Sequence, residues 1–328
     1  MKQSNLIRFL ILIALFLIGC FLSLMYGGSE TISWHSLNSG NFIFREIRFP
    51  KTITAIVAGS TLSVAGLILQ IIFRNPLAGP YVLGISSGAS LMVALGILAG
   101  NSVFLVSDLF IGKTFLVLSA ITGSLLVTFL ILLVSKKVNS NIVLLLIGLM
   151  FSQICGAIQT SLEYFSDPTS LKSFVVWGMG SLANTTGSDL LIYVPVALGS
   201  MLALVFFMKP LNALLLGQAY AQGVGINFNT NRFYLILISS VLTGVTTAFC
   251  GPIAFVGIAV PILSRMIFST SHQQVHFFSS MILGAIILLF SDTLCHSVVV
   301  GVSLPINMIT TFIGAPLVIY LMFKNKHW

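Results

Sequence analysis

The feature that most constrains this chain is a succession of long apolar windows with almost no charge. Ten windows occur, at 6–26, 53–73, 81–106, 114–134, 142–162, 190–208, 233–250, 253–268, 277–294 and 305–323. Only 7% of the residues are charged, whereas a soluble domain carries about 25%. About 20 apolar residues in a helix cross the roughly 30 Å hydrocarbon core of a bilayer. We therefore predict an all-α, polytopic membrane protein of about ten transmembrane helices, forming a single permease domain over 1–328.

Two places in this series need an argument of their own. The first window follows Lys2 and Arg8 and continues past Cys20, whereas the apolar core of a cleaved signal peptide would stop there. This indicates a retained first span. Without a break, the windows at 233–250 and 253–268 would form a helix of about 54 Å, too long for one crossing. Gly251-Pro252 is a natural chain reversal, so we predict two spans and leave open whether the second crosses fully.

The distribution of basic residues predicts the orientation. With the N-terminus inside, ten Lys and Arg residues fall on the inner side and five on the outer side, which satisfies the positive-inside rule. The inner set is Lys2, Arg8, Arg74, Lys136, Lys137, Lys209, Arg232, Arg265, Lys324 and Lys326; the outer set is Arg45, Arg48, Lys51, Lys113 and Lys172. All seven acids fall outside. Both termini are thus predicted to be cytoplasmic, and the net charge of +8 reflects topology, not a nucleic-acid partner.

Two short motifs suggest catalysis but fit packing better. The run 84–88, GISSG, matches the GxSxG nucleophile pattern, yet every histidine lies in a loop or at a span end, out of reach of a buried serine. Small residues that let helices approach closely explain the run better. An intramembrane hydrolase using Ser86 or Ser87 is the weaker alternative. Gly112-Lys113-Thr114 lacks the first glycine of a phosphate-binding loop, because Ser107 occupies that position and Asp108 follows it.

The chain also lacks the pattern of a metal or cofactor site. Its four cysteines are far apart and form no CxxC or Cys/His cluster, so we expect no disulfide, no metal and no cofactor. The spans carry no charged residue at their centres. Ion-coupled transporters usually need such groups near the bilayer midplane. We therefore predict a transporter that is driven by an external energy source, and an ion-coupled secondary transporter is the alternative.

Polar residues on two spans are candidates for the translocation pathway. In the fifth span, Ser152, Gly156, Gln159 and Glu163 recur on one helical face. In the tenth, Asn307, Thr310, Thr311 and Gly314 form a weaker series. Either a neutral pore lining, carried by Ser152, Gln159, Asn307 and Thr310, or ordinary hydrogen-bonded helix packing explains them, and the sequence does not choose.

Three segments together resemble the FecCD-type permeases of iron–siderophore, haem and cobalamin ABC importers. They are RFPK with RNPLAGPYVLGISSGA at 48–51 and 74–89, LLLGQAYAQGVG with GPIAFVGIAVPILSR at 214–225 and 251–265, and LPINMITTFIGAP at 304–316. The resemblance implies a type II importer subunit in the bacterial cytoplasmic membrane with no catalysis of its own. It would pair with a second permease, two cytoplasmic ABC ATPases and an external substrate-binding protein that delivers the chelate.

The resemblance also assigns roles to individual residues. It makes 209–232 a coupling loop of short helices against the ATPase, with Leu216, Gly217, Gln218, Ala221, Gly223 and Gly225 as the coupling set. It makes Arg48, Lys51 and His296 the docking set for the binding protein. The alternative for the coupling loop is a solvated loop without a specific partner. The alternative for the docking set is anchoring of the span ends in lipid headgroups. The chain departs from the family pattern at Gly79, Gln218, Ile262, Ser303 and Asn307.

Overall fold

The computed structural model describes residues 3–26, 42–98, 109–135, 137–138, 140–297 and 303–324, and these form helices and turns without a strand. Each apolar window corresponds to one helix. The ten are α1 (Gln3–Tyr26), α3 (Phe49–Phe73), α4 (Ile85–Leu98), α5 (Leu109–Ser135), α6 (Asn141–Phe165), α8 (Gly187–Phe206), α11 (Phe228–Cys250), α12 (Val256–Ile267), α13 (Gln273–Ser297) and α14 (Ile306–Lys324). Shorter helices lie between them: η1 (Ile43–Arg48), α7 (Pro168–Gly178), α9 (Met208–Leu216) and α10 (Gln218–Gly223).

The predicted all-α membrane fold is confirmed, and the ten helices that correspond to the apolar windows divide into two kinds. Within the described part of the chain, seven helical stretches are long and apolar enough to cross a membrane, and α4, α12 and α14 are shorter apolar helices. The 12 residues of α12 span about 18 Å, which is too short to cross the hydrocarbon core. Gly251, with φ +71°, and Pro252 separate α11 from α12, so the chain breaks where the sequence predicted.

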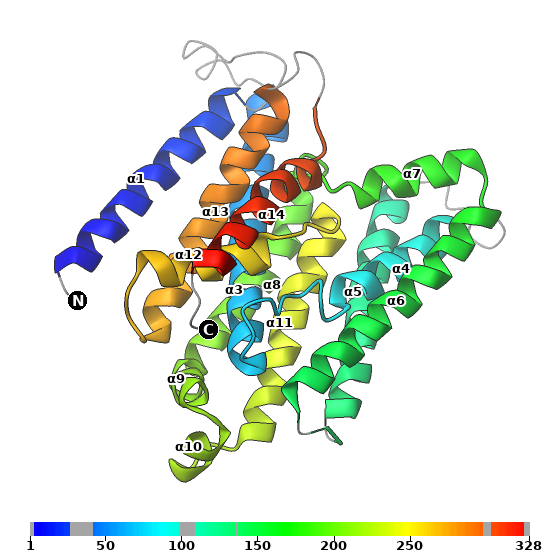
Figure 1. Cartoon of the computed structure of the whole chain (residues 1–328). Coiled ribbons are helices and arrows are strands. Elements are labelled where there is room, and N and C mark those ends of the chain that lie inside the picture. Colours follow the sequence, from blue (N-terminus) through cyan, green and yellow to red (C-terminus); the bar gives the residue numbers. More distant parts are fainter. Residues whose placement is uncertain are drawn as a thin grey trace.

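Helix α3 is the axis of the bundle. Nearly all of its residues are buried, because α11, α12 and α13 pack around it (Figure 1). Glycines make these approaches possible: a Cβ at Gly66 would lie 1.7 Å from the backbone oxygen of Gly257, and one at Gly59 would lie 2.2 Å from that of Gly284. Small residues at such crossings let backbones meet in an apolar environment.

The GISSG run is part of the same packing. Gly84 has φ +77°, and a Cβ there would lie 2.9 Å from Ser152 Oγ of α6. A Cβ at Gly88 would lie 2.4 Å from Val127 Cγ2 of α5. Ser86 is buried at the start of α4, and the small cavity beside it has no histidine among the described residues that line it. The structure thus supports helix packing as the role of this run.

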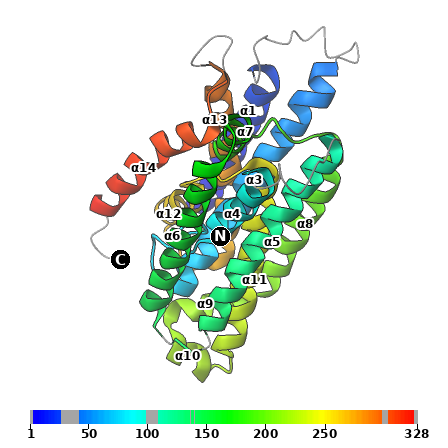
Figure 2. The ribbon, with the colours of Figure 1, turned by 90° about the vertical axis from the view of Figure 1, so that its right-hand side faces the viewer.

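The bundle has two distinct ends (Figures 1 and 2). One carries η1, α7 and the last turn of α13, and we call it the outer end after the predicted orientation. The opposite end carries α9 and α10, and we call it the inner end. Which end faces the cytoplasm remains a prediction from the basic residues.

Candidate transport pathway and coupling site

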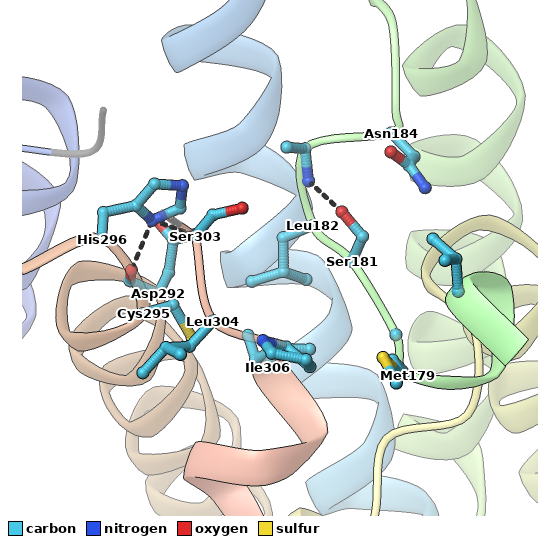
Figure 3. Close-up of a pocket in the computed structure, with 14 residues that line it drawn as sticks. Met179, Ser181, Leu182, Asn184, Asp292, Cys295, His296, Ser303, Leu304 and Ile306 are labelled. Atoms are coloured by element: carbon cyan, nitrogen blue, oxygen red, sulfur yellow. Dashed lines mark hydrogen bonds and ion pairs between the residues drawn. The ribbon is translucent and has the colours of Figure 1, made fainter. Parts of the chain in front are cut away.

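A cavity of about 380 Å³ opens at the outer end (Figure 3). It lies between the turn that follows α7, the last turn of α13 and the start of α14, and Met179, Asn184, His296 and Ile306 are among its lining residues. The turn is fixed because the backbone N–H of Asn307 donates to Met179 O at 3.3 Å. The cavity is therefore framed by segments that are far apart in the sequence.

A buried ion pair lies at the outer end of the bundle. Lys51 Nζ on α3 lies 2.9 Å from Asp292 Oδ2 on α13, with side chains 1% and 4% exposed. Ser23 of α1 donates to the same carboxylate oxygen at 3.4 Å and lies 3.0 Å from Thr52 Oγ1. His296 Nδ1 is 3.8 Å from Asp292 Oδ1. One carboxylate thus joins the outer ends of α1, α3 and α13.

Arg48 also makes internal contacts. Its Nη1 donates to the backbone oxygens of Leu24 and Met25, at 2.9 and 2.6 Å, and the residue is 2% exposed. These carbonyls belong to the last turn of α1, which lacks partners within the helix. Of the predicted docking set, Arg48 and Lys51 are thus buried with partners in their own subunit, and His296 keeps 18% of its side chain exposed. Their contact with a binding protein remains a prediction.

The acidic cap of α7 lies at the same end. Asp167 accepts from the backbone N–H groups of Ser170 and Thr169 at 3.0 and 3.1 Å. The backbone N–H of Ser170 and then its side chain, with smaller contributions from Thr169, lower the pKa of the Asp167 carboxyl to about 2. The carboxylate therefore stays charged at any physiological pH, which favours the N-terminus of a helix.

The predicted pathway residues fall into two structural groups. On α6, Ser152 donates to Gly148 O at 3.3 Å and Gln159 Nε2 donates to Glu163 Oε1 at 3.0 Å, and both side chains are partly exposed. On α14, Thr310 is buried and donates to Asn307 O at 3.3 Å.

Asn307 in turn serves the internal fold. Its Oδ1 accepts from the backbone N–H of Ala254 at 3.1 Å, which ties α14 to the break before α12. Helices α6 and α14 both lie on the side of the molecule away from α8 (Figure 2). All four predicted pathway side chains make hydrogen bonds within the chain, and Ser152 and Gln159 of α6 are in addition partly exposed.

The inner end carries a bend of two short helices, α9 and α10, which meet at Gly217. Gly217 has φ +118°, a backbone conformation that residues with a Cβ rarely adopt. Ala221 is fully buried and its backbone oxygen accepts from Ile226 N at 2.9 Å, which closes the turn after α10. Gln218, Gly223 and Gly225 are exposed. The predicted coupling set therefore occupies one compact corner.

The same corner exposes large apolar side chains. Leu216 is 66% exposed, Tyr220 51% and Val224 53%. Tyr220 and Val224 are four residues apart and fall on a common side of α10, and Leu216 is the last residue of α9, directly before the bend at Gly217. An apolar surface of this kind at the water-facing end of a membrane protein is typical of a protein–protein contact.

Comparison with known proteins agrees with the family resemblance of the sequence. The sequence profile described as the FecCD transport family matches residues 10–324. The chain belongs to the FecCD transport family. The hemin transport system permease protein HmuU of Yersinia pestis is 33% identical over 307 residues, covering 93% of this chain and 88% of that protein. The vitamin B12 import system permease protein BtuC of Vibrio parahaemolyticus is 35% identical over 289 residues, covering 85% and 82%.

Two solved structures share the fold of this FecCD chain. A chain from a metal-chelate type ABC transporter in an inward-facing conformation superimposes with a TM-score of 0.86 at 30% identity, covering 97% of this chain and 99% of that one. PsaBC from Streptococcus pneumoniae, at 18% identity and a TM-score of 0.60, shares the fold. The FecCD chain is thus a multi-pass membrane permease, and its relatives are transport permeases.

Sequence reasoning missed two parts of the site. The pairing of Lys51 with Asp292 joins residues at opposite ends of the chain, and nothing in their local sequence signals it. The exposed side chains of Tyr220 and Val224 were also missed, although their four-residue spacing in an inner loop was a usable signal. Among the described residues, no group of three His, Cys, Asp or Glu side chains is placed to hold a metal ion.

Proposed function

We propose that this chain is the membrane-spanning subunit of an ATP-driven importer for a bulky chelate such as haem, cobalamin or an iron–siderophore complex. The observation that carries the proposal is the family match over residues 10–324. The named functions of the two relatives, hemin and vitamin B12 transport, supply the cargo class. No ATPase motif occurs in the chain, so energy would come from separate subunits.

The geometry supports a division of labour between the two ends. The exposed apolar corner formed by Leu216, Tyr220 and Val224 suits a groove on a cytoplasmic ABC ATPase. The outer cavity, with His296 at its rim, suits receipt of cargo from an external binding protein. The partly exposed polar side chains of α6, Ser152 and Gln159, suit a translocation pathway that is shared with a second permease copy or a similar chain.

The chemistry of the α6 face fits an assembled chelate better than a free ion. Ser152 and Gln159 offer hydroxyl and amide groups, which bind polar surfaces weakly. Thiolate, imidazole or clustered carboxylate ligands would bind a bare transition metal tightly and retard its release. A neutral lining therefore favours a cargo whose metal is already coordinated.

The cargo class can be tested in proteoliposomes that contain the permease with its ATPase and are supplied with its binding protein. Uptake of haem, vitamin B12, a ferric hydroxamate and unchelated ferric ion would be compared at equal concentration with ATP inside the vesicles. We expect saturable uptake of one chelate and none of the free ion. Transport of free ferric ion, or of none of the chelates, would contradict the proposed cargo class.

A further inference from the structure

The inner end holds a buried cation without an anionic partner. Arg232, in the second turn of α11, is 3% exposed. Its Nε and Nη2 find no hydrogen-bond partner in the described part of the chain, and its guanidinium lies 5.7 Å from the Phe228 ring centroid. Burying a charge without an oppositely charged partner costs free energy. We therefore expect an anion to pair with this arginine.

The described part of the chain does not supply that anion. The described acidic residues, Glu46, Glu163, Asp167, Asp189 and Asp292, all lie in elements at the outer end. The neighbours of Arg232 in a small cavity of about 60 Å³ include Arg74, Asn141 and Gln218, which carry another cation and two neutral amides. Water could satisfy the hydrogen bonds of the guanidinium but would not neutralise its charge.

A larger cavity, of about 320 Å³, lies on the other side of Arg232. Its lining residues are Ser135 at the end of α5, and Asn229, Thr230, Arg232, Phe233 and Tyr234 in the first turns of α11. The N-terminus of a long helix attracts anions. The two unpartnered nitrogens, Nε and Nη2, share one edge of the guanidinium, which is the edge that binds two oxygens of a phosphate or carboxylate together.

The surroundings of this cavity point to a lipid as the source of the anion. Helix α5 ends at Ser135 in the cavity wall, and the ring of Tyr234, also in the wall, lies 6.2 Å from that of Phe207, the residue after α8. Above it, α8 presents an apolar surface, with Phe206 84% and Leu202 65% exposed. Aromatic side chains beside a basic residue at the end of a span are typical of the headgroup region.

We propose that the cavity at Arg232 binds the phosphate of an anionic phospholipid in the inner leaflet, with the acyl chains along the exposed face of α8. The bidentate edge of Arg232 holds the phosphate, and the first turn of α11 and Ser135 surround it. The neighbouring 60 Å³ cavity also includes Leu214 and Gln218 of the α9–α10 bend, so a bound lipid would lie next to the proposed ATPase contact. The inference does not depend on the cargo or on ATP coupling.

The test uses the purified full-length chain, stripped of lipid in mild detergent, and native mass spectrometry. Dioleoyl phosphatidylglycerol and dioleoyl phosphatidylcholine would be titrated into wild type, Arg232→Met, Arg232→Lys and the exposed inner-end control Lys137→Met. We expect one phosphatidylglycerol to bind wild type and Lys137→Met in preference to phosphatidylcholine. In Arg232→Met its apparent Kd should rise by about tenfold or more, because a charge-assisted bidentate contact is lost; Arg232→Lys should fall between.

A second variant guards against misfolding of Arg232→Met. Thr230→Trp fills the larger cavity while keeping Arg232, and it too should lose the bound phosphatidylglycerol. Equal lipid retention by wild type, Arg232→Met and Thr230→Trp would overturn the proposal. Displacement of the lipid by millimolar inorganic phosphate would identify a free-phosphate site instead. Loss of ATPase binding in both variants with unchanged lipid retention would assign Arg232 to a carboxylate of the ATPase, and the lipid site would then be rejected.

Discussion

At the scale of single residues, the charges of this protein gather at its two ends and have different partners there. At the outer end, Asp292 pairs with Lys51 inside the bundle. At the inner end, Arg232 is buried where the described chain offers no acid. The sequence places no charge at the centres of the predicted spans. It does not predict which charges become buried, because that depends on contacts between residues such as Lys51 and Asp292, hundreds of positions apart.

Removing one partner of the outer ion pair should destabilise the bundle. Lys51→Met leaves the Asp292 carboxylate buried and uncompensated, which costs about 3–5 kcal/mol. The double variant Lys51→Met with Asp292→Leu removes both charges and should recover most of that loss. Thermal unfolding in detergent would measure both, with the exposed Arg45→Met as control. A single variant with the Tm of wild type would show that the pair is not buried as described.

The docking prediction for Arg48 can be separated from its internal role. Arg48→Glu should weaken capture of the loaded binding protein, most strongly at low salt, if this charge contributes to docking. It should also lower the Tm, because Arg48 holds the last carbonyls of α1. Arg48→Met keeps the apolar stem and removes only the charge. Binding kinetics at two salt concentrations, with Arg45→Glu as the exposed control, would test this; affinity that is unchanged at both concentrations would rule out docking through Arg48.

At the scale of helices, the apolar windows predict the membrane-spanning elements well because each must satisfy its backbone hydrogen bonds internally. The connections are less predictable. Helix α7 was not predicted, because its mixed composition resembles that of a solvated loop between two spans. The short length of α12 follows from Gly251-Pro252, but its endpoint depends on packing against α3, which local sequence does not reveal.

The crossing of α3 with α12 should tolerate no side chain at Gly66. A Cβ there would lie 1.7 Å from the backbone oxygen of Gly257, and a backbone atom cannot move aside cheaply. Gly66→Ala should therefore lower the yield of folded protein and its Tm. Gly199→Ala, in α8 with nothing within 4 Å of the added Cβ, is the matched control. Equal monodispersity and Tm for the two variants would contradict the described crossing.

The inner bend should depend on Gly217 more than on the nearby Gly223. Gly217→Val forces a β-branched residue to φ +118° and places its Cβ 2.6 Å from Arg74 Nη2. We expect it to uncouple ATP hydrolysis from transport while the chain still folds. Gly223→Ala, whose added Cβ meets nothing within 4 Å, should disturb coupling less, and Gly199→Ala, in α8 outside the coupling set and equally free of contacts, should behave as wild type. Parallel assays of hydrolysis and uptake would show this, and wild-type coupling in Gly217→Val would remove the bend from the mechanism.

At the scale of the whole molecule, the family and the membrane fold were predictable because sequence motifs in order from 48 to 316 reinforce one another. Residue roles were not, because in the proposed function the pathway and docking surfaces are completed by other chains. The structure shows partly exposed polar side chains on α6, a cavity at one end and an exposed apolar corner at the other. These three surfaces are what a permease that relies on partners for cargo and energy would need.

In the proposed function, transport is powered by nucleotide hydrolysis on another chain and not by an ion gradient. The most direct test is chelate uptake into proteoliposomes that hold the permease with or without its ATPase, under imposed proton or sodium gradients or with internal ATP. We expect uptake only when ATPase and ATP are both present, and the same rate after the gradients are collapsed. Uptake driven by a gradient in vesicles that lack the ATPase would contradict the proposed function.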